Sequence, residues 1–353
     1  MAQFKPDFSR LRKVLLREGE PDVIPFYDYF ADGEVMEAVI GKPPTMETQV
    51  EFQYKMGYDY INAGIHLGYK HGMKHTADTA ALSSGERYFS DDNHGEIESR
   101  EDFDAYPWPE VKDAALLSQN IDKASSLLPD GMKIVLQMPC GVLENVMWLM
   151  GYVPFSYALY DDEELVSDLF ERIGQNHVRA LELCMEHVDV SKIGAIALAD
   201  DMGFNHSTMI APELLRKYVF PWHKKIVDIA HRYDLPMILH ACGNLETVMD
   251  DLIDDVGIDA KQSYEDKIMP VTEVKKKYGD RIAVLGGVDM NAICTLEEKE
   301  LRAYVRNIIQ VCGPGGGYAM GTGNTVANYI PLKNFYIMLD ETRKYGVYPI
   351  GKR

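Results

Sequence analysis

The sequence predicts an α/β fold in which eight parallel strands and their helices form one (β/α)8 barrel. Three observations carry this prediction. Short apolar runs recur eight times along 353 residues, amphipathic stretches lie between most of them, and no GxGxxG dinucleotide-binding motif follows the first run. Alternating strands and helices build parallel sheets through right-handed crossovers. Eight such units favour a closed TIM barrel over an open sheet.

The apolar runs have the length of strands and end at polar or glycine-containing turns. They span Val23–Tyr29, Tyr58–Ile65, Lys133–Cys140, Ile193–Ala199, Pro236–His240, Gly257–Gln262, Arg281–Gly286 and Gly317–Met320. Apolar residues at helical spacing predict helices between them. These helices are expected over Asp162–Val188, Pro212–Tyr233, Leu245–Val256, Val271–Tyr278 and Leu296–Cys312.

A single barrel domain is expected over residues 1–353, because barrels with insertions reach this length and no linker or repeat interrupts the pattern. One stretch breaks the rhythm after the second predicted strand. It covers about 83–109, contains Asn93-His94-Gly95, and ends Tyr106-Pro-Trp-Pro109. We interpret this stretch as a hairpin or lid inserted into the barrel.

Charge and cysteine content narrow the class of partner. The formal net charge of -19 repels phosphate, so neither nucleic acid nor an anionic membrane is expected as a partner. Five cysteines without a CxxC pair are typical of a reduced, cytoplasmic protein. No apolar run has the length of a signal peptide core or a membrane span. A homodimer is expected only because it is the commonest assembly.

Polar residues gather where the predicted strands end, which is where barrels of this kind carry their active sites. Buried polar groups at a barrel mouth must be paired, metal-bound or functional. The candidates for binding a substrate are Tyr27, Asp28, Gln137, Asn244, Tyr318 and Asn324. The candidates for catalysis are Asp200, Asp201 and Asp289.

His240 and Cys242 form the sharpest pattern at these strand ends. Residues two apart in a strand point to the same side, and an imidazole beside a thiolate suits Zn²⁺. Glu265, at the tip of the next strand, is the natural third ligand and would leave a fourth position open for catalysis. The residues alone equally allow a core histidine beside an inert cysteine, with Glu265 exposed in a loop.

Adjacent carboxylates at Asp200 and Asp201 follow another predicted strand. Because side chains alternate, one of the two must face the mouth, where it could orient a substrate or transfer a proton. A solvated turn is the alternative. Asp289 follows two glycines and is either a catalytic carboxylate or the N-cap of the next helix.

From about Ile193 onward, the chain resembles the uroporphyrinogen decarboxylase-like superfamily, which includes methyltransferases linked to corrinoids and to coenzyme M. The matching stretches keep the order and spacing of that superfamily. They are Ile210-Ala-Pro-Glu-Leu-Leu-Arg-Lys-Tyr-Val-Phe-Pro221, His240-Ala-Cys-Gly-Asn244, Tyr278-Gly-Asp-Arg-Ile-Ala-Val-Leu-Gly-Gly-Val-Asp289 and Gly313-Pro-Gly-Gly-Gly-Tyr318.

The resemblance points to the methyltransferase branch. Porphyrinogen decarboxylases begin with an arginine-rich segment that holds an acidic substrate, whereas this chain reads Ile24-Pro-Phe-Tyr-Asp-Tyr-Phe30, without arginine. The methyltransferases use a His-x-Cys pair on zinc, here His240 and Cys242. Related cobalamin-independent methionine synthases add a glutamate similar in place to Glu265. The further cysteine of coenzyme M methyltransferases is absent from 318–324.

Three functions therefore remain open from the sequence. The first is a zinc-dependent methyltransferase acting between a small methylated substrate, such as a methyl ether or methylamine, and a corrinoid on a partner protein. The second is a metal-independent decarboxylase of a smaller acid, in which Asp200 or Asp201 stabilises a cationic intermediate and His240 donates a proton. The third is a non-catalytic barrel that binds a corrinoid or a substrate.

Overall fold

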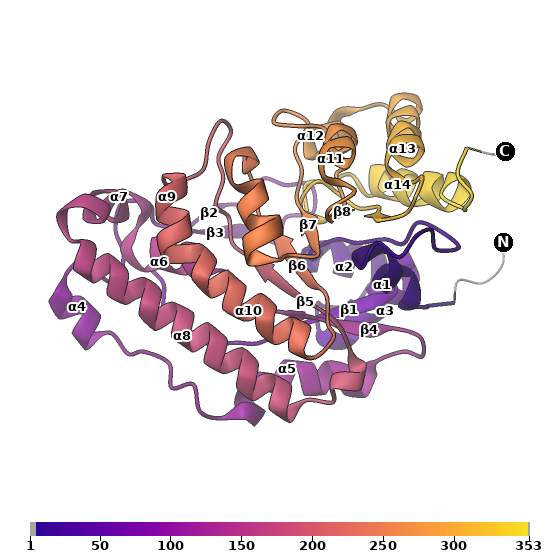
Figure 1. Cartoon of the computed structure of the whole chain (residues 1–353). Coiled ribbons are helices and arrows are strands. Elements are labelled where there is room, and N and C mark those ends of the chain that lie inside the picture. Colours follow the sequence, from indigo (N-terminus) through magenta and orange to yellow (C-terminus); the bar gives the residue numbers. More distant parts are fainter. Residues whose placement is uncertain (1–4, 352–353) are drawn as a thin grey trace.

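A seven-stranded parallel sheet forms the centre of the molecule, in the order β1-β4-β5-β6-β7-β8-β9 (Figure 1). The structure is a computed structural model that describes residues 5–351. The strands are β1 (Tyr60–Gly64), β4 (Lys133–Gln137), β5 (Ile193–Ala199), β6 (Met237–His240), β7 (Ala260–Gln262), β8 (Ala283–Leu285) and β9 (Tyr318–Ala319). Each lies within a predicted run, so the α/β class and the parallel sheet are confirmed.

The predicted first strand, Val23–Tyr29, is not a strand of this sheet, and here the prediction was wrong. Its backbone meets the other end of the sheet only at isolated points. Tyr27 N donates to Met320 O at 2.8 Å, and Met320 N donates to Pro25 O at 2.9 Å. Pro25 itself has no N–H to donate, which limits regular pairing.

Side chains replace backbone pairing between this first segment and β1. The hydroxyl of Tyr60 accepts from Asp28 N at 2.9 Å and donates to the Asp28 carbonyl at 2.5 Å. The amide of Asn62 donates to the carbonyl of Tyr29 at 2.8 Å. We call this boundary between residues 28–31 and β1 the seam, because side chains bridge it in place of a ladder of backbone bonds.

Helices cover the sheet, and the long helices α8 and α10 run side by side along it (Figure 1). Their amphipathic sequences bury one face each against the strands. The helices are α1 (Ser9–Leu15), α2 (Gly33–Ile40), α3 (Met46–Met56), α4 (Arg100–Ala105), α5 (Ala114–Leu127), α6 (Val142–Met150), α7 (Tyr152–Asp161), α8 (Glu163–His187), α9 (Pro212–Leu214), α10 (Phe220–Arg232), α11 (Val271–Tyr278), α12 (Met290–Thr295), α13 (Glu298–Cys312) and α14 (Leu332–Tyr345).

Two predicted helices are irregular. The stretch Pro212–Tyr233 contains α9, then the π-helical η2 (Leu215–Val219), then α10. Pro221 near the start of α10 lacks the N–H that would bond the carbonyl four residues earlier, which accounts for the widened turn before it. The stretch Leu245–Val256 holds only short 3-10 and π segments. These segments, with one more before β5, are η1 (Val190–Lys192), η3 (Glu246–Val248) and η4 (Asp251–Val256).

A separate antiparallel hairpin follows β1 and consists of β2 (Met73–Ala77) and β3 (Glu86–Ser90). The predicted insertion at about 83–109 contains β3 and α4 but not β2. Most residues of both strands are exposed. The hairpin does not pair with the central sheet, as expected of an element inserted between two strands of it.

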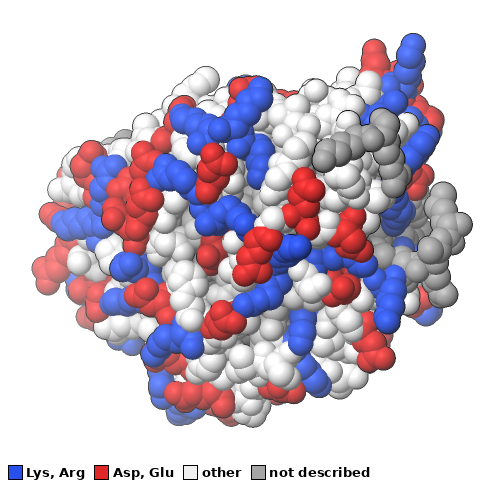
Figure 2. All heavy atoms as spheres, turned by 45° about the vertical axis from the view of Figure 1, so that its right-hand side comes forward, with Lys and Arg blue, Asp and Glu red and all other residues white. Residues whose placement is uncertain are grey.

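Acidic and basic side chains are interspersed over the face seen in Figure 2, where neither sign forms a continuous patch. Ion pairs also form beneath the surface. Glu341 on α14, for example, is buried and binds both Arg302 at 2.7 Å and Arg306 at 3.0 Å on α13. Within residues 5–351, the helices are all too short or too polar to cross a membrane.

Asp28 ties the first segment to two other parts of the molecule. One carboxylate oxygen accepts from the Thr322 N–H at 2.8 Å and the Thr322 hydroxyl at 2.6 Å, and the other accepts from the Tyr58 hydroxyl at 2.6 Å. The side chain is buried, and this burial raises the pKa of Asp28 to about 6 despite the three hydrogen bonds.

Asp28→Asn should flatten the pH dependence of stability. The folded pKa of about 6 lies above the reference value of 3.8, so the folded protein binds this proton more tightly. The stabilisation is complete below pH 3.8 and is lost as the pH rises through 6, by roughly 3 kcal/mol. Urea denaturation between pH 4 and 7 measures it. Exposed Asp130→Asn should keep the wild-type slope, and an unchanged slope in Asp28→Asn would contradict the assignment.

Candidate metal centre

Three neighbouring strands bring their last residues into one row. In the parallel register, Ala199 on β5 lies opposite His240 on β6, and His240 lies opposite Gln262 on β7. Asp201 and Cys242 each lie two residues beyond this row. As a result, Asp201, His240 and Cys242 offer ligand atoms that all lie within 4.8 Å of one another.

The orientation of the His240 ring is fixed from two sides. Its Nδ1–H donates to the side-chain oxygen of Gln262, whose amide nitrogen donates to the Asn324 carbonyl at 2.6 Å. The Tyr29 ring stacks on the imidazole with centroids 4.6 Å apart. Burial lowers the pKa of His240 and favours the neutral ring. The lone pair therefore resides on Nε2, the atom that faces the other two groups.

Cys242 and Asp201 complete the group. The His240 Nε2 lies 3.6 Å from Cys242 Sγ and 3.9 Å from an Asp201 carboxylate oxygen. That same oxygen accepts from Cys242 N–H at 2.7 Å. The sulfur also receives hydrogen bonds from Asn324 Nδ2 at 3.1 Å and Ser263 Oγ at 3.4 Å. Two donors aimed at one sulfur are what a thiolate requires.

The donor set fits Zn²⁺. Imidazole nitrogen, thiolate sulfur and carboxylate oxygen are its usual ligands, and three protein ligands with one open position are typical of catalytic zinc. Burial and the nearby Asp201 carboxylate raise the pKa of the Cys242 thiol, so the thiolate is disfavoured while no cation is present. A divalent cation would offset both negative charges.

Glu265, the predicted third ligand, does not join this group. Within residues 5–351, Asp201, His240 and Cys242 are the one set of such residues close enough to share an ion. Glu265 instead lines a small cavity together with Asn244. Ser263 explains the difference, because its φ of +84° turns the chain at the end of β7 before Glu265 is reached.

Asp200 and Asp201 have different surroundings. Asp200 is fully buried and accepts from Leu143 N at 3.2 Å and Glu144 N at 3.0 Å at the start of α6, and from His223 Nε2 at 2.8 Å. It therefore stabilises the N-terminus of that helix. Asp201 lines the open cavity at the mouth, so it is the carboxylate of the pair that faces this cavity.

Two other predicted residues accept hydrogen bonds from nearby backbone N–H groups. Asp289 accepts from Ala292 N at 2.9 Å as the N-cap of α12, and from Asp266 N at 3.0 Å. Asn244 accepts from Glu246 N at 3.0 Å. Neither residue belongs to the group of Asp201, His240 and Cys242. The geometry of Asp289 is that of the helix N-cap, the alternative that the sequence left open.

The remaining predicted substrate residues are divided between three places. Tyr27 and Tyr318 are fully buried in the interior of the fold. Asp28 and Gln137 line a cavity at the seam. The side-chain amide of Asn324 donates a hydrogen bond to the sulfur of Cys242.

Sequence reasoning missed three residues that shape the centre. Gln262 orients His240, and only the strand register reveals this. Lys261 is a buried lysine in β7 whose ammonium donates to the carbonyls of Ala241 at 2.9 Å and Ser263 at 2.7 Å. Glu144, beside Asp201, has a pKa well above the usual value because its carboxyl is buried and two carboxylates lie nearby.

An open cavity of about 600 Å³ adjoins Asp201 and has room for a small substrate. Its walls combine carboxylates with apolar and aromatic side chains. They include Asp92, Glu144, Met147, Trp148, Tyr152, Asp201 and Phe204. Among all the residues that line it in the described part of the chain, none is Lys, Arg or His. We call this space the mouth cavity.

Comparisons with known proteins show a family match and a shared fold. A family model described as "Uroporphyrinogen decarboxylase (URO-D)" matches residues 142–345. The uroporphyrinogen decarboxylase of Thioalkalivibrio sulfidiphilus (strain HL-EbGR7) is 23% identical over 145 residues, which are 39% of this chain and 39% of that protein. The match thus spans about two fifths of the curated relative's length.

A solved structure is also similar over nearly the full chain. It is a methyltransferase from Methanosarcina mazei, with a TM-score of 0.69 and 14% sequence identity. The similarity covers 97% of this chain and 99% of that one. At this identity the likeness establishes a shared fold.

Lys261→Met should weaken metal binding without touching a ligand. The Lys261 ammonium holds the carbonyl between His240 and Cys242, and methionine leaves that carbonyl unpaired and the loop less ordered. We expect zinc affinity to fall about tenfold or more. A competition titration with a chromophoric chelator measures this change.

Lys267→Met, at an exposed position in the same loop region, is the matched control and should bind zinc as the wild type does. Equal zinc affinity of Lys261→Met and the wild type, with both folded, would show that the lysine does not position the loop.

Proposed function

The chain belongs to the uroporphyrinogen decarboxylase family, and within it we propose a zinc-dependent methyltransferase. It would move a methyl group between a small methylated substrate, a methyl ether or methylamine, and a corrinoid carried on a partner protein. The observation that carries this proposal is the group of Asp201, His240 and Cys242 beside the mouth cavity.

Asp201, His240 and Cys242 would hold the metal and leave one position open toward the mouth cavity. Bound zinc would act as a Lewis acid that polarises the heteroatom carrying the methyl group. Gln262 keeps Nε2 of His240 free of a proton. Asn324 stabilises negative charge on the sulfur of Cys242.

Glu144 is our candidate for the proton donor. Its carboxyl lines the mouth cavity together with Asp201, and burial favours the protonated form. When a methyl group passes from a neutral ether or amine to the corrinoid, the heteroatom retains the electron pair of the broken C–O or C–N bond and takes up a proton to become a neutral alcohol or amine. A buried carboxylic acid at the same cavity can supply that proton.

The lining of the mouth cavity also supports the methyltransferase over the decarboxylase. An acidic substrate would need a cationic partner. The described residues that line this cavity include Asp92, Glu144 and Asp201, but no Lys, Arg or His. The Asp92 carboxylate in this lining would repel an anion. The cavity therefore favours a neutral or positively charged methylated compound.

We also propose that the chain is one domain and a closed (β/α)8 barrel. Residues 24–31 would take the place of the eighth barrel strand. Backbone hydrogen bonds join them to the β9 side of the sheet, and the side chains of the seam join them to β1. The hairpin of β2 and β3 would be its inserted lid, since Ser90 and Asp92 line the mouth cavity.

Metal titration tests the proposed ligands. The wild type should bind close to one equivalent of zinc, and His240→Ala, Cys242→Ala and Asp201→Asn should each lower the affinity at least about tenfold. Glu265→Gln, which changes the carboxylate favoured by the sequence, is the matched control and should not lower it. If Glu265→Gln weakens zinc as much as His240→Ala while Asp201→Asn does not, the ligand set is wrong.

Turnover separates the three functions. We expect the zinc-loaded protein to form methylcobalamin from reduced cobalamin and a methylated donor, visible in the absorption spectrum, and chelation followed by zinc should abolish and then restore it. Decarboxylation of an acid that survives chelation would instead support the decarboxylase. Zinc binding without any turnover across methyl ethers and methylamines would support the non-catalytic barrel.

A further inference from the structure

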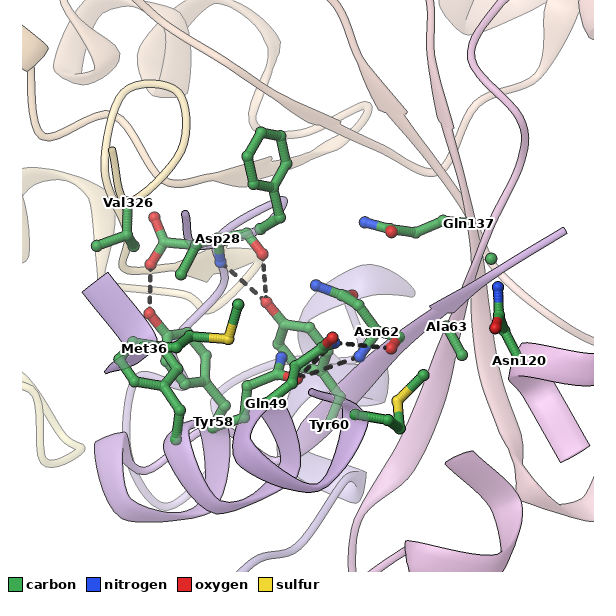
Figure 3. A pocket seen from close by; sticks show the side chains of 16 residues that line it. Asp28, Met36, Gln49, Tyr58, Tyr60, Asn62, Ala63, Asn120, Gln137 and Val326 are labelled. Atoms are coloured by element: carbon green, nitrogen blue, oxygen red, sulfur yellow. Dashed lines mark hydrogen bonds between the residues drawn. The ribbon is translucent and has the colours of Figure 1, made fainter. Parts of the chain in front are cut away.

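A second cavity lies at the seam, apart from the candidate metal centre. It has a volume of about 210 Å³ and shares no lining residue with the mouth cavity. The first segment, α2, α3 and β1 surround it (Figure 3). We call it the seam cavity.

Carboxamides dominate the polar lining of the seam cavity. Five of its residues carry side-chain amides, and among its lining residues in 5–351 there is no Lys, Arg or His. They are Gln49, Gln53, Asn62, Asn120 and Gln137. The one carboxylate, Asp28, already has each of its oxygens bonded to Thr322 or Tyr58. A neutral ligand suits such a lining better than an ion, because neither charge would find a free counter-ion.

Backbone partners fix which way three of these amides face. Asn62 Nδ2 and Gln137 Nε2 each donate to the carbonyl of Tyr29 at 2.8 Å. Gln53 Oε1 accepts from Asn62 N at 3.3 Å. A carbonyl can only accept and an N–H can only donate, so none of the three amides can be flipped. What remains for a ligand is an oxygen on Asn62, an oxygen on Gln137 and an NH₂ on Gln53.

The oxygen of Asn62 has no hydrogen-bond partner. It belongs to a buried residue that is only 6% exposed, and no donor among the described residues reaches it. An unpaired buried acceptor is costly in a folded protein. A ligand N–H at this end of the cavity would remove that penalty as neighbouring side chains adjust.

We propose that the seam cavity binds a small neutral molecule bearing a primary carboxamide. Its two N–H groups pair with the oxygens of Asn62 and Gln137, and its carbonyl accepts from the NH₂ of Gln53. Met36, Met46 and Phe52 supply apolar surface for the rest of the molecule. The proposal stands independently of the metal centre and of methyl transfer.

Calorimetric titration with propionamide tests this site. The wild type should bind it saturably, with a dissociation constant of about a millimolar for so small a ligand. Propionate and propylammonium have similar length but carry charge, and each should bind at least about tenfold more weakly.

Two variants locate the binding. Asn62→Leu keeps the side-chain shape but loses the amide, and Met36→Trp fills the cavity while leaving every amide in place. Each should weaken propionamide at least about tenfold. Asn307→Leu, at an exposed position on α13, should bind as the wild type does. Circular dichroism confirms folding, and Met36→Trp decides the matter should Asn62→Leu not fold.

Absence of saturable binding to the wild type would overturn the proposal. Equal affinity for propionamide, propionate and propylammonium would overturn it as well, because the ligand would then not be selected by its amide. Unchanged affinity in the folded variants would place the binding elsewhere on the protein.

Discussion

The parallel register of β5, β6 and β7 is the constraint on which the candidate centre depends. It sets His240 between Ala199 and Gln262, so that one neighbour orients the imidazole and the chain beyond the other supplies Asp201. A slip of one residue would turn the His240 side chain to the opposite face. Strand pairing therefore fixes the position of His240 in the candidate metal centre. Asp201 and Cys242 lie just beyond the ends of β5 and β6.

Electrostatics at the mouth follow from two adjacent carboxylates with different partners. The carboxylate of Asp200 accepts hydrogen bonds from the first N–H groups of α6, whereas the carboxylate of Asp201 lines the mouth cavity. The same helix carries Glu144 to the mouth, where burial raises the pKa of its carboxyl and favours the protonated form. The sulfur of Cys242 and the carboxylate of Asp201 lie together at a site where a cation would offset their negative charges, and the carboxyl of Glu144 lies beside it.

Features that depend on the spacing of neighbouring residues could be predicted from the sequence. Seven apolar runs became strands, and the placement of His240 beside Cys242 follows from alternation alone. The choice of Asp201 over Glu265 could not be predicted, because it depends on the positive φ of Ser263. The irregular form of Val23–Tyr29, predicted as a regular strand, could not be foreseen, because side chains of β1, including Tyr60, replace its backbone partners.

X-ray absorption at the zinc edge of the zinc-loaded protein tests the central claim most directly. Ligation by Asp201, His240 and Cys242 predicts a single sulfur at about 2.3 Å, with nitrogen and oxygen neighbours at about 2.0–2.2 Å. The sulfur contribution should vanish in Cys242→Ala. Two or more sulfur ligands, or a wild-type spectrum with none, would contradict the account.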